Sequence, residues 1–221
     1  MTNFPEKLTA SELQEIGIVA IVRTGANAPF REIAGALLQG GLRAIEITLT
    51  TPDALLAITL LRREFSPTLR VGVGTVLDVS DALTAIAAGA EFVVTPTLQP
   101  ETIAACREQG VPIACGSLTP TEALAAHRAG ADFVKLFPSD TLGPAYVKAI
   151  LGPLPFLKII PTGGVNLETI GAFFQAGCVG VAIGGNLVSK KIIEEQDWDG
   201  LAALAGQYAA ALQAARSVQT K

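Results

Sequence analysis

Short apolar runs rich in β-branched residues recur along the chain, and each is followed by a turn and a stretch rich in alanine and leucine. Nearly continuous apolar runs of this length are typical of parallel strands that are covered on both faces. The alanine- and leucine-rich stretches between them favour helices. The runs predict eight strands, at Ile18–Val22, Ala44–Leu49, Arg70–Gly74, Phe92–Thr95, Pro112–Cys115, Phe133–Leu136, Lys158–Pro161 and Gly180–Ile183.

Helix-capping residues stand after several of the predicted strands. Serine, threonine, aspartate and asparagine accept hydrogen bonds from the free N–H groups of a first helical turn, and proline is tolerated there. Four segments therefore predict helix starts: Thr51-Pro52-Asp53, Asp78 with Ser80 and Asp81, Thr119-Pro120-Thr121-Glu122 and Asn166-Leu167-Glu168.

One pattern occurs four times: a helix ends, a glycine supplies a left-handed cap, a small residue follows, and a strand begins. The glycines lie 48, 41 and 47 residues apart, and each interval contains two predicted strand–helix pairs. Such a repeat divides an eightfold ring into quarters. The four glycines are Gly41, Gly89, Gly130 and Gly177.

The predicted fold class is therefore α/β, a single (β/α)8 TIM barrel over residues 1–221 with a short N-terminal helix. No linker rich in proline or serine and no block of charge divides the chain, so we expect one domain. An open doubly wound sheet is the alternative. The even spacing of the strands and the lack of a GxGxxG motif after the first strand argue against it.

Composition narrows the range of partners. Half of the residues are hydrophobic, 16% are charged and the net charge is −4, so the chain offers no broad basic surface for nucleic acid. The most apolar stretch, residues 170–188, is interrupted by Gln175, Asn186 and several glycines and predicts a helix, a turn and a strand rather than a membrane span. Residues 1–7 lack the pattern of a signal peptide, which predicts a cytoplasmic protein.

Cysteine and histidine usage favours neither disulfides nor metal. Cys106, Cys115 and Cys178 are odd in number, are widely spaced and form no CxxC motif, which indicates free thiols in a reducing compartment. The only histidine, His127, falls on a predicted helix and is expected at the surface. We therefore expect no metal and no cofactor.

A lysine lies near the end of the sixth predicted strand, in an otherwise apolar run. Side chains alternate across a strand, so Phe133, Lys135 and Phe137 share one face. Burial disfavours the charged form of a lysine and lowers its pKa, and a neutral lysine can form a Schiff base with a carbonyl substrate. The alternative is a lysine whose ammonium reaches water or a carboxylate.

Glu46 lies in the second predicted strand, with a parity that points its side chain inward. In a barrel the active site lies at the carboxyl ends of the strands, so Glu46 and Lys135 are expected to approach each other there. They would form either a structural ion pair or a Schiff-base lysine served by a proton-transferring carboxylate. Two glycines before Thr75 and two after Thr162 leave room around the pair, which favours the second interpretation.

Paired glycines follow the last two strands: Gly163 and Gly164 after the seventh, Gly184 and Gly185 after the eighth. Barrels bind phosphate at this place through backbone N–H groups near the start of a short helix. The alternative is that the glycines only form tight left-handed turns. The two pairs together predict a phosphate-binding site.

Five segments, in chain order, resemble one family: Ala44–Leu49, Val73–Leu77, Val94–Pro96, Val134–Pro138 and Pro161–Val165. They are similar to the 2-keto-3-deoxy-6-phosphogluconate (KDPG) aldolases, class I aldolases that also handle 4-hydroxy-2-oxoglutarate and the galactonate analogue of KDPG. The resemblance covers nearly the whole chain. It implies a homotrimer that needs no metal and binds a small 2-keto acid.

The resemblance also implies roles for individual residues. Lys135 would form the Schiff base, and Glu46 would be the acid/base carboxylate. The remaining matching residues would contact the keto acid or shape its pocket: Arg23, Thr75, Pro96, Phe137 and Thr162.

Two positions depart from the family's pattern. Thr50 stands where the KDPG enzymes commonly have a carboxylate-binding arginine, although a polar uncharged residue there resembles the galactonate branch. Gly185 stands where relatives often have a serine that reaches the phosphate, and losing such a donor costs roughly 1.5–3 kcal/mol. Both changes make the short diacid 4-hydroxy-2-oxoglutarate a candidate substrate beside KDPG.

The expected reaction is the reversible cleavage of a 4-hydroxy-2-keto acid to pyruvate and an aldehyde. The same imine would expel CO2 from oxaloacetate, so a decarboxylase is one alternative. The others are a phosphate-binding barrel isomerase or synthase, and a barrel that binds a keto acid or phosphate without turnover.

Overall fold

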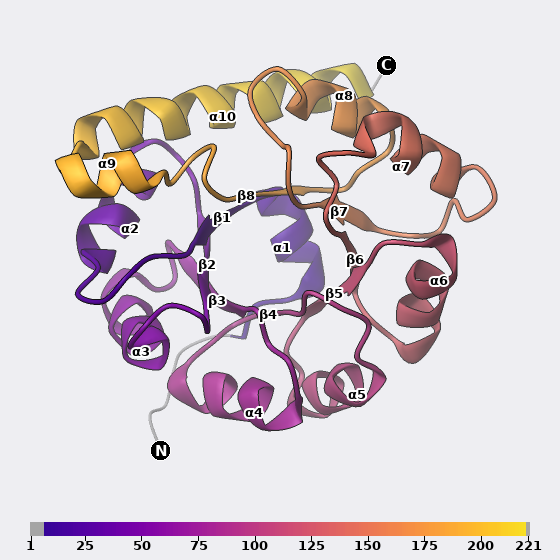
Figure 1. The fold of residues 1–221 in the computed structure, drawn as a ribbon, viewed down its shortest axis with the longest axis horizontal. Helices are drawn as coiled ribbons and strands as arrows, with labels where there is room; N and C mark the ends of the chain where they lie inside the picture. The colour runs from indigo at the N-terminus through magenta and orange to yellow at the C-terminus, as the bar shows by residue number, and fades with distance from the viewer. Residues whose placement is uncertain (1–6, 220–221) are drawn as a thin grey trace.

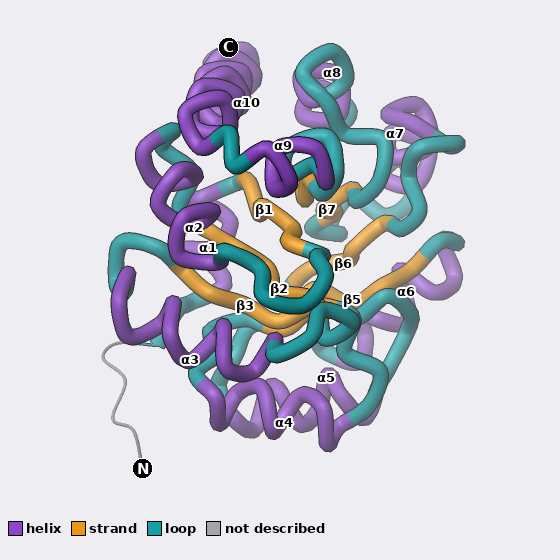
Figure 2. The backbone as a smooth tube through the Cα atoms, turned by 60° about the vertical axis from the view of Figure 1, so that its left-hand side comes forward, coloured by secondary structure: helices purple, strands orange, loops and turns teal. Residues whose placement is uncertain are grey.

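Eight parallel strands form one sheet that curls into a ring with helices outside it (Figures 1 and 2), as the sequence predicts. The structure, a computed structural model, describes residues 7–219 and the side chains of residues 7–217. The strands are β1 (Ile18–Val22), β2 (Ala44–Thr48), β3 (Arg70–Gly74), β4 (Val93–Val94), β5 (Ile113–Ser117), β6 (Phe133–Leu136), β7 (Ile159–Pro161) and β8 (Val181–Ile183).

A helix follows each strand, and two more complete the described chain. The helices are α1 (Ala10–Ile16), α2 (Phe30–Gln39), α3 (Ala54–Phe65), α4 (Val79–Ala88), α5 (Pro100–Gln109), α6 (Pro120–Ala129), α7 (Gly143–Leu151), α8 (Ile170–Gln175), α9 (Lys190–Glu195) and α10 (Trp198–Gln219). The predicted short N-terminal helix is α1, and the long α10 packs against α2 and α8 (Figure 1).

The ring follows the order β7-β6-β5-β4-β3-β2-β1-β8. A parallel bridge between Thr162 and Ala182 joins β7 to β8 and closes it. The carboxyl ends of all the strands therefore face the same end of the barrel, where the first turn of each following loop can contribute to one site.

Strand parity divides the core into two layers. Inward-facing side chains such as Ile21, Phe92 and Phe133 form one cluster inside the ring. Outward-facing ones such as Ile45 and Val134 pack under the helices in the other. Leu13 of α1 joins the inner cluster, so α1 closes the amino-terminal end of the barrel and leaves the opposite end open (Figure 1).

The predicted strand bounds are close to those observed. The predicted bounds of β1, β3 and β6 match the structure. The predicted strand at residues 92–95 is shorter, because the Thr95 hydroxyl donates to the Thr97 carbonyl at 2.7 Å and the chain turns there. The four repeated glycines have positive φ angles of 88°, 112°, 97° and 104°, as a left-handed cap requires.

Of the four predicted helix caps, two are confirmed, one is wrong, and the fourth caps a turn before its helix. Thr119 forms a capping box with Glu122, and Asp78 accepts from the N–H group of Asp81. Asp53 stands at the cap position of α3 but makes no side-chain cap bond, because its backbone is left-handed with φ 59°. Asn166 accepts from two N–H groups of the turn before α8 rather than from the helix itself.

The predictions that the cysteines are free and that His127 lies at the surface are confirmed. All three cysteines are buried and free, and His127 is exposed on α6 with its ring 4.8 Å from that of Phe156. Between residues 7 and 219, no helix is long and apolar enough to cross a membrane.

Candidate active site

Lys135 lies on the inner face of β6, at the same level as Gly116 of β5 and Ile160 of β7. The side chain is 6% exposed. Its Nζ lies 5.0 Å from the centre of the Phe137 ring, which follows two residues later on the same face. The ring face attracts a cation, and on the β5 side the space over Gly116 is filled by the backbone of Pro96 and Thr97 rather than by a side chain.

Glu46 lies on the inner face of β2, between Ile21 of β1 and Gly72 of β3. It is 1% exposed, and its Oε2 has no hydrogen-bond partner among the described residues. Burial raises the pKa of the Glu46 carboxyl above its usual value, and the positive charges of Lys135 and Arg23 oppose that rise. A buried carboxylate oxygen without a partner is poised to exchange protons with a ligand or a bound water.

The structure does not support a structural ion pair between these two groups. In the described part of the chain, no ion pair within 4.0 Å joins Glu46 to Lys135. A structural role would require each buried charge to be matched by hydrogen bonds. The charge of Lys135 instead acts on Glu46 and opposes the rise of its pKa, and one oxygen of the Glu46 carboxylate has no partner among the described residues.

Two glycines of β3 leave space on the inner face of the sheet, and the Glu46 carboxylate occupies the space over one of them. A Cβ atom at Gly74 would overlap the carboxylate, so the side chain of Glu46 occupies that space. A Cβ at Gly72 would overlap the ring of Phe92. The predicted open room before Thr75 is therefore filled: the glutamate itself takes one part, and core packing takes the other.

Replacing Gly74 by alanine is expected to displace the Glu46 carboxylate and lower kcat by on the order of 100-fold, since a shift of about 1 Å has that effect on catalysis. Gly35→Ala is the matched control, because a Cβ at Gly35 meets nothing within 4 Å. Steady-state kinetics and circular dichroism of both variants check the prediction. Equal kcat values for the two variants would contradict it.

Thr75 and Pro96 follow β3 and β4 at the open end of the barrel. Thr75 has a φ of 59°, a conformation that costs a β-branched residue about 1–3 kcal/mol. The peptide after Pro96 lies where a Cβ of Gly116 would be, which places this loop beside Lys135 on the next strand. Both predicted residues therefore lie at the same end as the lysine and the glutamate.

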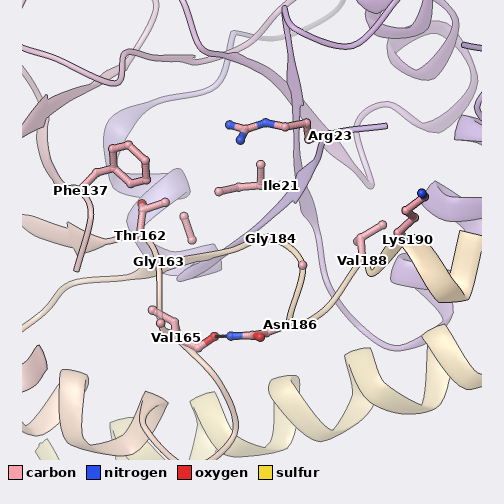
Figure 3. Close-up of a pocket in the computed structure, with 13 residues that line it drawn as sticks. Ile21, Arg23, Phe137, Thr162, Gly163, Val165, Gly184, Asn186, Val188 and Lys190 are labelled. Atoms are coloured by element: carbon pink, nitrogen blue, oxygen red, sulfur yellow. Dashed lines mark hydrogen bonds between the residues drawn. The ribbon is translucent and has the colours of Figure 1, made fainter. Parts of the chain in front are cut away.

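A cavity of about 440 Å³ opens above β1, β6, β7 and β8 (Figure 3). Seven of the predicted site residues line it, whereas Lys135, Glu46, Thr75 and Pro96 do not. The buried hydroxyl of Thr162 has no partner among the described residues. Figure 3 shows the Arg23 side chain extending over Ile21 toward the side of Phe137 and Thr162. The seven are Arg23, Phe137, Thr162, Gly163, Gly164, Gly184 and Gly185.

The two glycine loops adjoin this cavity. Gly163 and Gly164 have φ angles of 94° and 71°, and a Cβ at Gly164 would lie 2.6 Å from the Cα of Asp140, so the close approach requires a glycine. Across the described residues, the N–H groups of Gly163, Gly164 and Gly185 donate to no protein acceptor. Backbone donors of this kind suit an anion such as phosphate.

Three further residues shape this end of the site and were not predicted. The Asn186 side chain donates to the Val165 carbonyl at 2.9 Å and ties the two loops together (Figure 3). The Ser139 hydroxyl lies 2.7 Å from the Gly163 carbonyl. Lys190 brings a positive charge to the cavity wall. A polar residue directly after the second glycine pair was a usable signal for Asn186; the other two depend on how the loops pack.

Thr50 is exposed, and its hydroxyl lies 3.1 Å from that of Thr48. A threonine cannot supply the two-pronged positive charge of an arginine. Arg23 and Lys190 are the cationic side chains that line the described cavity.

Comparison with known proteins places the chain in a family. A family model described as KDPG and KHG aldolase matches residues 9–204. The 2-dehydro-3-deoxy-phosphogluconate aldolase of Pseudomonas aeruginosa is 37% identical over 84% of this chain and 84% of that protein. The 2-dehydro-3-deoxy-6-phosphogalactonate aldolase of Escherichia coli is 31% identical over 78% and 85%.

A solved structure has the same fold and is informative about the chemistry of the family. The KDPG aldolase of Legionella pneumophila, with pyruvate captured as a covalent carbinolamine intermediate, superposes with a TM-score of 0.83 at 26% identity, over 90% of this chain and 97% of that one. A barrel with a buried lysine and glutamate at its open end, matched along most of its length by these proteins, is an aldehyde-lyase that belongs to the KDPG and KHG aldolase family.

Proposed function

We propose that this protein cleaves KDPG to pyruvate and an aldehyde through a Schiff base on Lys135. The observation that carries the proposal is the pairing of two buried groups at the open end of the barrel. Lys135 is 6% exposed beside a glycine, and Glu46 is 1% exposed with an unpartnered oxygen. The similarity to KDPG aldolases over most of the chain supports the same reaction.

In this mechanism the Lys135 amine attacks the C2 ketone, and loss of water gives a protonated imine. Glu46, through a water, takes the proton of the C4 hydroxyl. The C3–C4 bond then breaks, the aldehyde leaves, and the electron pair moves toward the imine nitrogen to give an enamine. Protonation at C3 and hydrolysis of the imine release pyruvate and restore the lysine.

The other predicted residues would bind the substrate. The unpartnered hydroxyl of Thr162 and the strained Thr75 would hydrogen-bond the keto acid, while Phe137 and Pro96 would form the walls around it. Arg23 would bind the substrate carboxylate from the mouth of the barrel. These roles fit the positions of the side chains around the lysine and the cavity.

The phosphate would lie against the two glycine loops, where the free N–H groups of Gly163, Gly164 and Gly185 are available. Lys190 adds a positive charge on the same wall. These donors favour KDPG over the unphosphorylated 4-hydroxy-2-oxoglutarate, despite the missing serine at Gly185. Oxaloacetate decarboxylase, barrel isomerase or synthase, and non-catalytic binding protein are not favoured by the family match.

Replacing Gly185 by serine is expected to lower the KM for KDPG about tenfold, because a hydroxyl on a charged oxygen contributes roughly 1.5–3 kcal/mol. A Cβ at Gly185 meets nothing within 4 Å and the backbone has no positive φ, so serine fits without strain. The KM for unphosphorylated 4-hydroxy-2-oxoglutarate is the internal control and is expected to stay unchanged. An equal effect on both substrates would show that the phosphate lies elsewhere.

The resemblance also supports a homotrimer. The three buried, free thiols support a location in the reducing cytoplasm. Exposed leucines on neighbouring helices, Leu56 and Leu60 of α3 and Leu83 of α4, are available for contact between subunits. Light scattering of the purified protein would measure the mass of the assembly.

Borohydride trapping tests the proposed function directly. Incubation with pyruvate and borohydride reduces an imine to a stable amine, and the protein is expected to gain one pyruvate-derived mass. Peptide mapping should place it on Lys135. A protein that cleaves KDPG without gaining this mass, or that gains it on another lysine, would overturn the proposed mechanism.

A further inference from the structure

Hydrogen bonds from two threonines of β2 and the turn after it hold the backbone on both sides of Arg23. The N–H group of Thr24 donates to the Thr51 hydroxyl at 3.2 Å. The Thr48 hydroxyl donates to the Val22 carbonyl at 3.4 Å. The two hydroxyls lie 3.1 Å apart. The side chains of both threonines are buried, at 0% and 2% exposed for Thr48 and Thr51.

These contacts fit a single direction of donation. Each hydroxyl has one hydrogen to donate and can accept as well. Thr51 accepts from the Thr24 N–H group and donates to Thr48, which donates in turn to the Val22 carbonyl. The hydrogen bonds therefore hold the peptide group after Arg23 to the turn that follows β2, and the peptide group before Arg23 to the end of β2.

Apart from its electrostatic interaction with Glu46, little else fixes the direction of the Arg23 side chain. In the described part of the protein, no carboxylate or carbonyl forms a hydrogen bond or ion pair with its guanidinium. The residues that follow, Gly25, Ala26 and Asn27, are exposed, and Asn27 has a positive φ of 58°. The direction in which the Arg23 guanidinium extends across the barrel mouth (Figure 3) thus depends on the backbone at residues 22–24. Thr50 adds no positive charge there.

We propose that Thr51, both directly and through Thr48, is a positioning residue that orients Arg23 toward the carboxylate of the 2-keto acid. This inference rests on the role of Arg23 in the proposed function. Thr48 and Thr51 would then act in carboxylate recognition at the mouth of the barrel, because Thr50 supplies no positive charge for that carboxylate. Thr51 itself touches no reacting atom.

Thr51→Val keeps the shape of the side chain and removes the hydroxyl. It is expected to raise the KM for KDPG about three- to tenfold with kcat within twofold of the parent, since one hydrogen bond is lost and the chemistry is unchanged. Thr51→Ser restores the hydroxyl and is expected to restore KM. Thr24→Val is the matched control, because that hydroxyl bonds only to the neighbouring Gly25 carbonyl and should leave KM unchanged.

A double-mutant cycle separates positioning from a general loss of stability. In an Arg23→Ala background, Thr51→Val is expected to have no further effect on KM, although it should lower the midpoint of thermal unfolding equally in both backgrounds. Additive effects on KM, or a KM unchanged in Thr51→Val, would overturn the inference while leaving the proposed function intact. A KM unchanged in Arg23→Ala would instead remove the proposed role of Arg23 and the inference together.

Discussion

Replacing Lys135 by alanine is expected to lower kcat/KM for KDPG by on the order of 10⁴-fold or more, because the imine forms on this amine. The other lysine described at the open end, Lys190, lies exposed on the cavity wall and not on the inner face of a strand. The Lys135 amine lies 5.0 Å from the centre of the Phe137 ring and at the level of Gly116. Steady-state kinetics and borohydride trapping would both register the loss. Lys135→Arg is expected to fail equally, since it keeps the charge but cannot form the imine.

Lys158 supplies a matched control for this result. Its Nζ lies 5.9 Å from the centre of the Phe133 ring, but it precedes β7 and therefore lies at the amino-terminal end of the barrel. Lys158→Ala also removes an amine that lies near an aromatic ring, although Lys158 is exposed, and is expected to keep full activity and full trapping. Comparable losses in Lys135→Ala and Lys158→Ala would mean that activity depends on general stability rather than on an imine at Lys135.

Replacing Glu46 by glutamine is expected to lower kcat by about 10²–10⁴-fold, the range for losing a group that transfers protons. The change keeps the size of the side chain within the space over Gly74. Because burial raises the pKa of the Glu46 carboxyl, the acid side of the pH–rate profile of the parent should lie above the usual range for a glutamate. The residual activity of Glu46→Gln should lack this decrease on the acid side of the pH–rate profile.

The Glu46→Gln change, which lowers activity, should raise the free energy of unfolding at neutral pH. The folded state holds the Glu46 proton more tightly than the unfolded chain, so the parent loses stability as pH rises from 4.5, the ordinary pKa, through the raised pKa of the folded protein. Glu46→Gln removes this loss. Urea unfolding should show the variant to be as stable as the parent below that window and more stable above it.

Glu91 provides the contrast, because this buried carboxylate is paired with Arg70 at 2.9 Å and with Arg62 at 3.2 Å. Glu91→Gln removes one partner of a buried ion network and is expected to cost about 3–5 kcal/mol of unfolding free energy without changing the chemistry. A Glu46→Gln variant that lost stability in the same way at neutral pH would indicate a structural role for that carboxylate.

The sequence predicts the ring and the two central groups because both follow from local periodicity. Alternation along β2 and β6 is enough to place Glu46 and Lys135 on the inner face, and repeated glycine caps are enough to count the strand–helix pairs. The alternation along a single strand does not predict how side chains of neighbouring strands pack against each other. The ring of Phe92 fills the space over Gly72, and the Glu46 carboxylate fills that over Gly74, and both depend on the register of neighbouring strands.

Hydrogen bonds between loops cannot be predicted from the sequence either. The position of Thr51 before Pro52 predicts a helix start, whereas its hydroxyl accepts a hydrogen bond from the Thr24 N–H group in the loop after β1. Asn186 lies 21 residues from the carbonyl that it bonds. Such pairings depend on the closure of the ring, which brings the ends of different strands together and which no single segment encodes.

Closure itself is uneven around the barrel, and this affects how the site can move. Between β7 and β8 the structure has one bridge, Thr162 to Ala182, and one further backbone bond, from the Val179 N–H group to the Ile159 carbonyl. The two glycine loops stand on opposite sides of this seam, and the Asn186 side chain spans it with a hydrogen bond to the Val165 carbonyl. Few backbone bonds must therefore break for the barrel to open locally at this seam, so amide hydrogen exchange should be fastest along it.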